Sequence, residues 1–139
     1  MAIGDITVKA TIGASSGRDR LKLFYVVGTE DGGRYFHSLL WERQIAGEWR
    51  KHHQLTQDDF QWQHPYSRWV AQIHSFLPEQ NRAIVQVGEG NKPMYPIYPG
   101  RGTSYFYSWR LWDLLSNTEL KRLKDCEDPF EPYAPGDES

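Results

Sequence analysis

The sequence contains a single cysteine, Cys126, among its 139 residues. One cysteine cannot form an intrachain disulfide, so packing must stabilise the fold, and a reducing compartment is expected. No apolar run comes near the ~20 residues that a membrane-spanning helix requires. The N-terminus also lacks a basic segment followed by an apolar stretch, so we expect no signal peptide. These absences predict a cytoplasmic protein with no membrane partner.

Basic residues are missing from the C-terminal end. Residues 125–139 contain six acids and no lysine or arginine, so all 16 basic residues lie in 1–124. The net charge of −2 therefore combines a body of about +4 with an acidic end. A body this weakly basic falls short of the bias expected of a dedicated DNA-binding protein. We expect one domain over residues 1–128 and an acidic, flexible tail over residues 129–139.

Recognised catalytic and metal-binding spacings are also missing. The five histidines do not fall at the spacing of metal ligands. The glycine segments 88–90 and 100–102 do not match a phosphate-binding loop. Cys126 lies among acids, which raise the pKa of a thiol and make it a poor nucleophile. The sequence therefore favours a protein that is not an enzyme, with no catalytic residues, no metal and no cofactor.

One enzymatic alternative stays open, a small metal-dependent hydrolase. Such a site needs carboxylates that hold a metal and activate water. Acidic and basic side chains of this kind occur without a recognised motif at Asp58, Asp59, His64, Glu89 and Lys92.

Aromatic residues are abundant, with six Trp, eight Tyr and six Phe in the chain. Alternation of apolar and polar residues predicts β-strands in several of the aromatic segments. The two firmest are 21–29 and 34–41, which the segment 30–33 connects as a hairpin because its two glycines tolerate positive φ. Further strands are expected over 6–12, 82–87 and 105–112.

Two amphipathic helices are predicted later in the chain. Thr56 resembles a helix N-cap followed by acids, and Pro65 then favours a helix that ends before Pro78. Its apolar side chains recur at helical spacing: Trp69, Ile73, Phe76 and Leu77. A last, short helix is expected over 116–124, with Leu120 and Leu123 as its apolar contacts. Residues 42–55 fit a helix or a second hairpin turning at Ala46-Gly47-Glu48, and we slightly favour the hairpin.

The order of predicted elements indicates a single α+β domain, with a mainly antiparallel sheet of about five or six strands and two helices packed on it. Several strands are apolar on both faces. In 105–112, Phe106 and Trp112 face one way, and the other aromatic side chains face the opposite way. Helices covering both faces, a curled barrel or a docked partner would each explain this pattern.

The aromatic strand and the loop before it form the candidate binding site. Residues 91–102 are rich in proline and glycine, which predicts a long surface loop. Trp109 and Trp112 are expected in the core, whereas exposed aromatics and arginines are typical of protein-binding hot spots. The predicted partner-binding residues are Tyr95, Tyr98, Arg101, Tyr105, Tyr107 and Arg110.

The sequence thus predicts a non-enzymatic interaction module that binds an unidentified protein partner, or a second copy of itself. Binding of single-stranded nucleic acid is an alternative, because the basic body and the Tyr/Trp/Arg strand could form a stacking platform.

Overall fold

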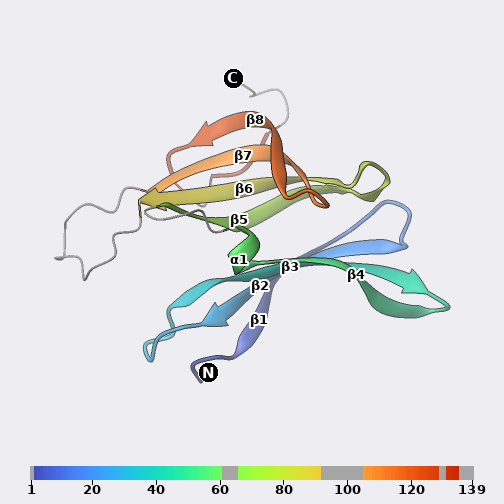
Figure 1. The fold of residues 1–139 in the computed structure, drawn as a ribbon, viewed down its shortest axis with the longest axis horizontal. Coiled ribbons are helices and arrows are strands. Elements are labelled where there is room, and N and C mark those ends of the chain that lie inside the picture. The colour runs from blue at the N-terminus through green and yellow to red at the C-terminus, as the bar shows by residue number, and fades with distance from the viewer. Residues whose placement is uncertain (1, 61–65, 92–104, 129–130, 135–139) are drawn as a thin grey trace.

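The computed structural model describes residues 2–60, 66–91, 105–128 and 131–134. Two four-stranded antiparallel sheets lie one over the other, with a short helix between them (Figure 1). Sheet A contains, in chain order, β1 (Ile6–Gly13), β2 (Asp19–Val27), β3 (Arg34–Ile45) and β4 (Glu48–Thr56). Sheet B contains β5 (Tyr66–Leu77), β6 (Arg82–Asn91), β7 (Tyr105–Asp113) and β8 (Thr118–Cys126). The helix α1 spans Gln57–Phe60, and a 3₁₀ turn spans Pro78–Gln80.

The predicted α+β class is wrong, because the described chain is mostly β and has two sheets rather than one. Both predicted amphipathic helices are strands. The segment expected to be a helix up to Leu77 is β5, and the segment 116–124 lies mainly in β8. The predicted start at Thr56 is correct only for the single turn of α1.

Bulges in β5 explain the false helical spacing. Val70, Ile73 and Phe76 are three residues apart, yet they pair with residues of β6 that are only two apart. The register shifts twice, between Val70 and Gln72 and again between Ile73 and Ser75. Each bulge adds one residue to the bulged strand, so a two-residue repeat becomes a three-residue repeat. The sequence pattern of such a strand is close to that of a helix.

The same irregularity occurs in β8. Glu119, Arg122 and Asp125 are three residues apart, but their partners on β7 are two apart. Leu120 and Leu123 are the residues that the register skips. The three-residue spacing of Leu120 and Leu123 favoured a helix, but it is the distance in sequence between two bulges.

The predicted hairpins of sheet A are confirmed. β2 pairs with β3 on either side of residues 28–33, and β3 pairs with β4, so residues 42–55 are strand and turn. Ala46 and Gly47 have φ of 53° and 82°. Two successive positive φ values are those of the turn type that matches the twist of a two-residue hairpin.

The second sheet explains why several strands are apolar on both faces. The inner faces of the two sheets share one core, in which Leu23 and Trp41 of sheet A meet Val85 and Trp112 of sheet B. α1 contributes Phe60, whose ring stacks on Trp112 with a centroid separation of 5.6 Å. A smaller cluster covers the outer face of sheet B, with Trp109, Leu123 and Tyr133 at its centre.

Side chains of sheet A also satisfy the backbone of β5. Tyr25 Oη donates to the carbonyl of Val70 at 2.7 Å, and Lys9 Nζ donates to the carbonyl of Ala71 at 2.9 Å. Lys9 also lies over the Tyr25 ring, and burial lowers the pKa of its amine. A bulge in β1 beside Lys9 and an inward-pointing charge are both features that discourage further strands from adding to a sheet edge.

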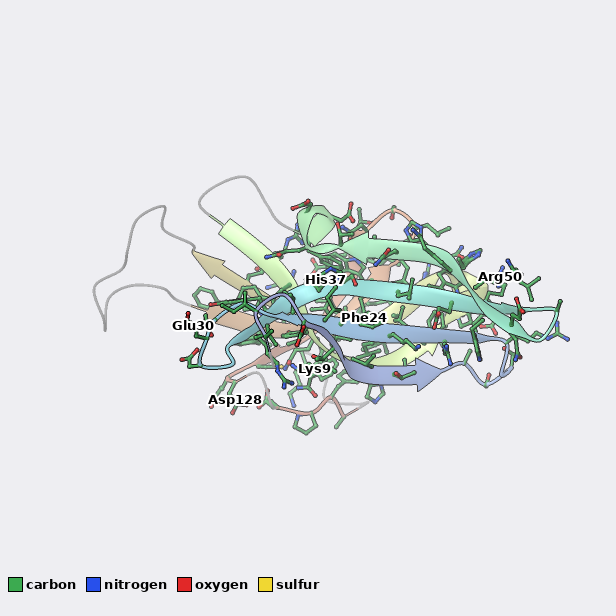
Figure 2. The ribbon with its side chains drawn as sticks, turned by 90° about the horizontal axis from the view of Figure 1, so that it is seen from below. Lys9, Phe24, Glu30, His37, Arg50 and Asp128 are labelled. Carbon is green, nitrogen blue, oxygen red and sulfur yellow. The ribbon has the colours of Figure 1, made fainter. Side chains whose placement is uncertain are left out.

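The outer face of sheet A is turned to the viewer in Figure 2, where Phe24 and His37 are labelled along β2 and β3. Three large apolar side chains of β1 and β3 on this face are at least half exposed: Ile6, Val8 and Tyr35. In the described part of the chain, no helix has the length and hydrophobicity to cross a bilayer.

Candidate functional site

Three of the six predicted partner-binding residues lie outside the described residues: Tyr95, Tyr98 and Arg101. Tyr105 is the first residue of β7. Tyr107 and Arg110 lie farther along the same strand and, three residues apart in a regular ladder with β6, point to opposite faces of sheet B. The described members of the predicted site are therefore divided between the two faces.

Arg110 is a buried arginine at the centre of a polar network. Its side chain is 2% exposed, although Glu89 and Glu119 beside it are about one-third exposed. Arg110 Nη1 donates to Glu89 Oε1 at 3.0 Å, and Nε lies 2.7 Å from Ser108 Oγ and 3.1 Å from Glu119 Oε1. Glu89 belongs to β6 and Glu119 to β8, so Arg110 connects three strands through charge-assisted bonds.

Two further arginines extend this network over the inner face. Arg68 Nε of β5 lies 3.7 Å from Glu89 Oε1. Arg122 lies 3.6 Å from Glu119 and 3.8 Å from Asp125. The network therefore combines three arginines with three carboxylates on the inner face of sheet B.

Burial and pairing act in opposite directions on these groups. Burial alone would raise the pKa of Glu89, but the hydrogen bond from Arg110 and the positive charges nearby outweigh it and lower that pKa. Burial lowers the pKa of Arg68 to about 10, against the opposing effect of Glu89. Glu89 and Arg68 therefore stay ionised at neutral pH, and the network as a whole contains as many arginines as carboxylates. A network with equal numbers of positive and negative groups has little net attraction for an anion.

One end of this network opens into a hollow of about 270 Å³, which we call the β7 hollow. Phe106, at its edge, is 66% exposed, the largest exposed fraction among the large apolar side chains of the described residues. An exposed aromatic beside a charged recess can pack against an apolar side chain while the recess binds polar groups. The hollow is lined by Glu89, Phe106, Tyr107, Ser108, Arg110, Arg122, Asp125 and Cys126.

Tyr107 is positioned by a close approach across sheet B. Trp69 of β5 and Tyr107 flank Gly88 of β6 in register. Their rings meet edge to face with centroids 5.9 Å apart. A Cβ at Gly88 would lie 2.4 Å from Trp69 Cε2, so only glycine leaves room for the indole there.

Cys126 is a lining residue with an unreactive thiol. Its pKa is raised, as the sequence predicts, but burial is the main cause, with the Glu131 carboxylate adding to it. A thiol with a raised pKa is a poor nucleophile at neutral pH.

The described residues of the hydrolase alternative form no metal site. Asp59 Oδ2 accepts hydrogen bonds from N and Oγ1 of Thr56 at 2.6 and 2.9 Å, which is a capping arrangement at α1. Glu89 is bound by Arg110 in sheet B, whereas His64 and Lys92 lie outside the described residues. No group of three or more His, Cys, Asp or Glu residues within the described ranges could hold a metal ion.

Sequence reasoning missed Phe106, Glu119, Arg122 and Asp125 as neighbours of Arg110. The last three share one face of β8 only because its bulges convert a spacing of three into adjacent positions. Alternation along β7 did indicate that Phe106 faces away from Tyr107, and the register agrees. Whether Phe106 is exposed depends on how far sheet A extends over sheet B, and the local sequence pattern does not predict that.

Comparisons with protein-family models, curated proteins and solved structures found no match. The function therefore has to be inferred from the arrangement of the residues themselves.

Proposed function

We propose that the chain is a non-enzymatic interaction module that binds a protein partner at the start of β7, around the β7 hollow. The observation that carries this proposal is the exposure of Phe106, at 66%, beside a recess lined by arginines and carboxylates. Partner-binding hot spots combine aromatic anchors with arginine and a polar rim. The preceding loop, with Tyr95, Tyr98 and Arg101, is proposed to complete the binding surface.

The charge network supports a protein partner of mixed charge. Arg122 and Asp125 are the more exposed members, with side chains 48% and 76% exposed. They can exchange their mutual contact of 3.8 Å for charges on a partner, whereas Arg110 is held in place by three neighbours. The partner would place an apolar side chain against Phe106 and acidic and basic groups over Arg122 and Asp125. The single cysteine supports a cytoplasmic setting for this encounter.

Site-specific photocrosslinking in cells of the native host tests the proposal. A benzophenone amino acid at position 106 should capture one discrete protein. The same amino acid at position 120 is the control, because Leu120 is also exposed, at 43%, and belongs to β8 away from the hollow. The adduct at position 106 should disappear in a Tyr98→Ala/Arg101→Ala background that keeps the thermal unfolding midpoint. Equal capture at 106 and 120, or capture of nuclease-sensitive material at 106, would contradict a protein-binding site here.

Self-association is a second candidate, favoured by the outer face of sheet A. Ile6 and Val8 of β1 and Tyr35 of β3 are 52%, 50% and 53% exposed, and Val26 of β2 pairs with both Ile6 and Tyr35. Contiguous exposed apolar side chains often mark an interface. Sedimentation equilibrium should show a concentration-dependent dimer that Val8→Lys abolishes and Lys51→Ala leaves intact. A monomer at all concentrations would exclude this candidate.

Single-stranded nucleic acid has less support as a ligand. Trp109 and Trp112 are only 2% and 1% exposed, so they have no free face on which a base could stack. The arginines of the β7 hollow are paired with carboxylates, which reduces their attraction for phosphate.

A further inference from the structure

Residues 131–134 pack on the outer face of sheet B. Trp109 Nε1 donates to the Glu131 carbonyl at 3.1 Å, and Gln86 Nε2 lies 3.4 Å from the same oxygen. Both donors are buried, with Gln86 0% and Trp109 2% exposed. Buried donors need an acceptor, so this part of the sheet is complete only when a backbone carbonyl occupies it.

An aromatic socket accompanies the two donors. The Tyr133 ring is 8% exposed and meets the His74 ring edge to face, with centroids 4.9 Å apart. The Trp109 ring also contacts Tyr133, with centroids 5.8 Å apart. Leu123 belongs to the same cluster, and partly buried apolar residues close it: Ile84, Leu111 and Cys126. We call the two donors and this socket the tail groove.

The resident segment is joined to sheet B through side chains of the sheet and not through a strand ladder. Residues 131–134 have no strand assignment, so they are not a ninth strand of sheet B. Glu131 Oε2 is buried, and the carboxylate lies beside the Cys126 thiol. Burying a carboxylate beside a thiol makes docking less favourable than the socket alone would allow. A better-matched segment could therefore displace this one.

We propose that the tail groove is a recognition site for an extended segment of a partner protein, in which an aromatic side chain follows a free backbone carbonyl by two residues. The chain's own Glu131-Pro132-Tyr133 is the displaceable resident of that site. The donors recognise the carbonyl, and the socket recognises the ring. This site is separate from the one in the proposed function. The tail groove is on the outer face of sheet B and the charge network of the β7 hollow is on the inner face; among the described residues only Cys126 borders both.

Peptide binding to the full-length chain tests the proposal. The probe is a fluorescent peptide with the sequence of residues 127–139, titrated by anisotropy into the wild type and the Tyr133→Ala variant. The variant should bind the peptide saturably. The wild type should bind it at least tenfold more weakly, because its own segment competes at an effective concentration of about millimolar. A matched peptide carrying Tyr133→Ala should bind neither form.

Hydrogen exchange of the wild type provides a second measurement that requires no variant to fold. The Trp41 indole N–H is the control, because it donates to Asp19 Oδ1 at 2.8 Å in the main core. The Trp109 indole N–H should exchange at least about tenfold faster, through opening of the segment alone. Equal exchange of the two indoles would overturn the proposal and make the segment a fixed part of the core. Failure of a folded Tyr133→Ala chain to bind the peptide would overturn it as well, and so would equal binding of the two peptides.

Discussion

Replacing Arg110 with methionine tests whether the ion pairs of Arg110 stabilise the fold. The side chain of Arg110 is 2% exposed and interacts with Glu89 and Glu119 at 3.0 and 3.1 Å. Methionine has a similar length and fills much of the space, so the change removes mainly the charge and its hydrogen bonds. Two carboxylates on the strands flanking β7 then lose their common partner.

The expected loss of stability can be bounded from these contacts. Removing one partner of a buried ion pair typically costs about 3–5 kcal/mol, because the other charge is left without compensation. Here the two carboxylates are 31% and 32% exposed, so water can solvate them in part. We therefore expect Arg110→Met to lower the free energy of unfolding by about 2–3 kcal/mol. Arg122→Met is the control: its side chain is 48% exposed and its contacts are 3.6 and 3.8 Å long, so it should cost less than about 1 kcal/mol.

Urea denaturation followed by tryptophan fluorescence measures the free energy of unfolding of the wild type and of both variants. The measurement is repeated from neutral to acid pH. The folded-state pKa of Glu89 lies below its ordinary value of 4.5, so the stability it contributes is present above that pH and lost as pH falls through the folded-state pKa. Without Arg110 the hydrogen-bonded part of this contribution is lost, and only the weaker effect of Arg68 and Arg122 remains. The difference between wild type and Arg110→Met should therefore narrow below about pH 4.5. A difference that is independent of pH, or no larger than that of Arg122→Met, would refute the assigned role of Arg110.

Two packing predictions can be checked by thermal denaturation. Gly88→Ala should lower the free energy of unfolding by about 1–3 kcal/mol, because its Cβ would lie 2.4 Å from Trp69 Cε2. Gly13→Ala is the control, because a Cβ there meets nothing within 4 Å. Equal thermal midpoints for the two variants would contradict the close approach at Gly88. Phe60→Ala should cost about 3–5 kcal/mol, because the ring is 2% exposed between Phe36 and Trp112. A cost below about 1 kcal/mol would mean that α1 is not part of the core.

Local signals predicted the hairpins of sheet A correctly because those strands keep nearly regular alternation and turn at residues that accept positive φ. Ala46-Gly47 is an example, since the pair has the φ values of a tight turn. The same reasoning failed for β5 and β8, where the hydrophobic repeat has a period of three. Bulges produce that period, and a bulge is visible only in the register with a neighbouring strand. Strand β5 has no neighbour close in sequence before it, so nothing local distinguished it from a helix.

The candidate site was only partly accessible to sequence reasoning, for a related reason. Arg110 was predicted as a surface contact, yet it is buried because carboxylates from β6 and β8 compensate its charge. A sequence gives the charge of a residue but not the partners that permit its burial. Tyr107 was predicted to bind a partner as well, and its edge-to-face contact with Trp69 gives it an intramolecular role.

The abundance of aromatic residues, which first suggested a binding protein, is explained largely by the fold. The fold requires large side chains in two places, the core shared by the two sheets and the cluster on the outer face of sheet B. Trp41, Trp112 and Phe60 fill the shared core. Trp109 and Tyr133 fill the outer cluster. Aromatic content alone is therefore not evidence of an interface in this chain. What distinguishes Phe106 is that it is exposed on a strand whose tryptophans are buried. The case for partner binding at β7 thus depends on one exposed ring and its charged neighbours, which is why position 106 should be tested before any other.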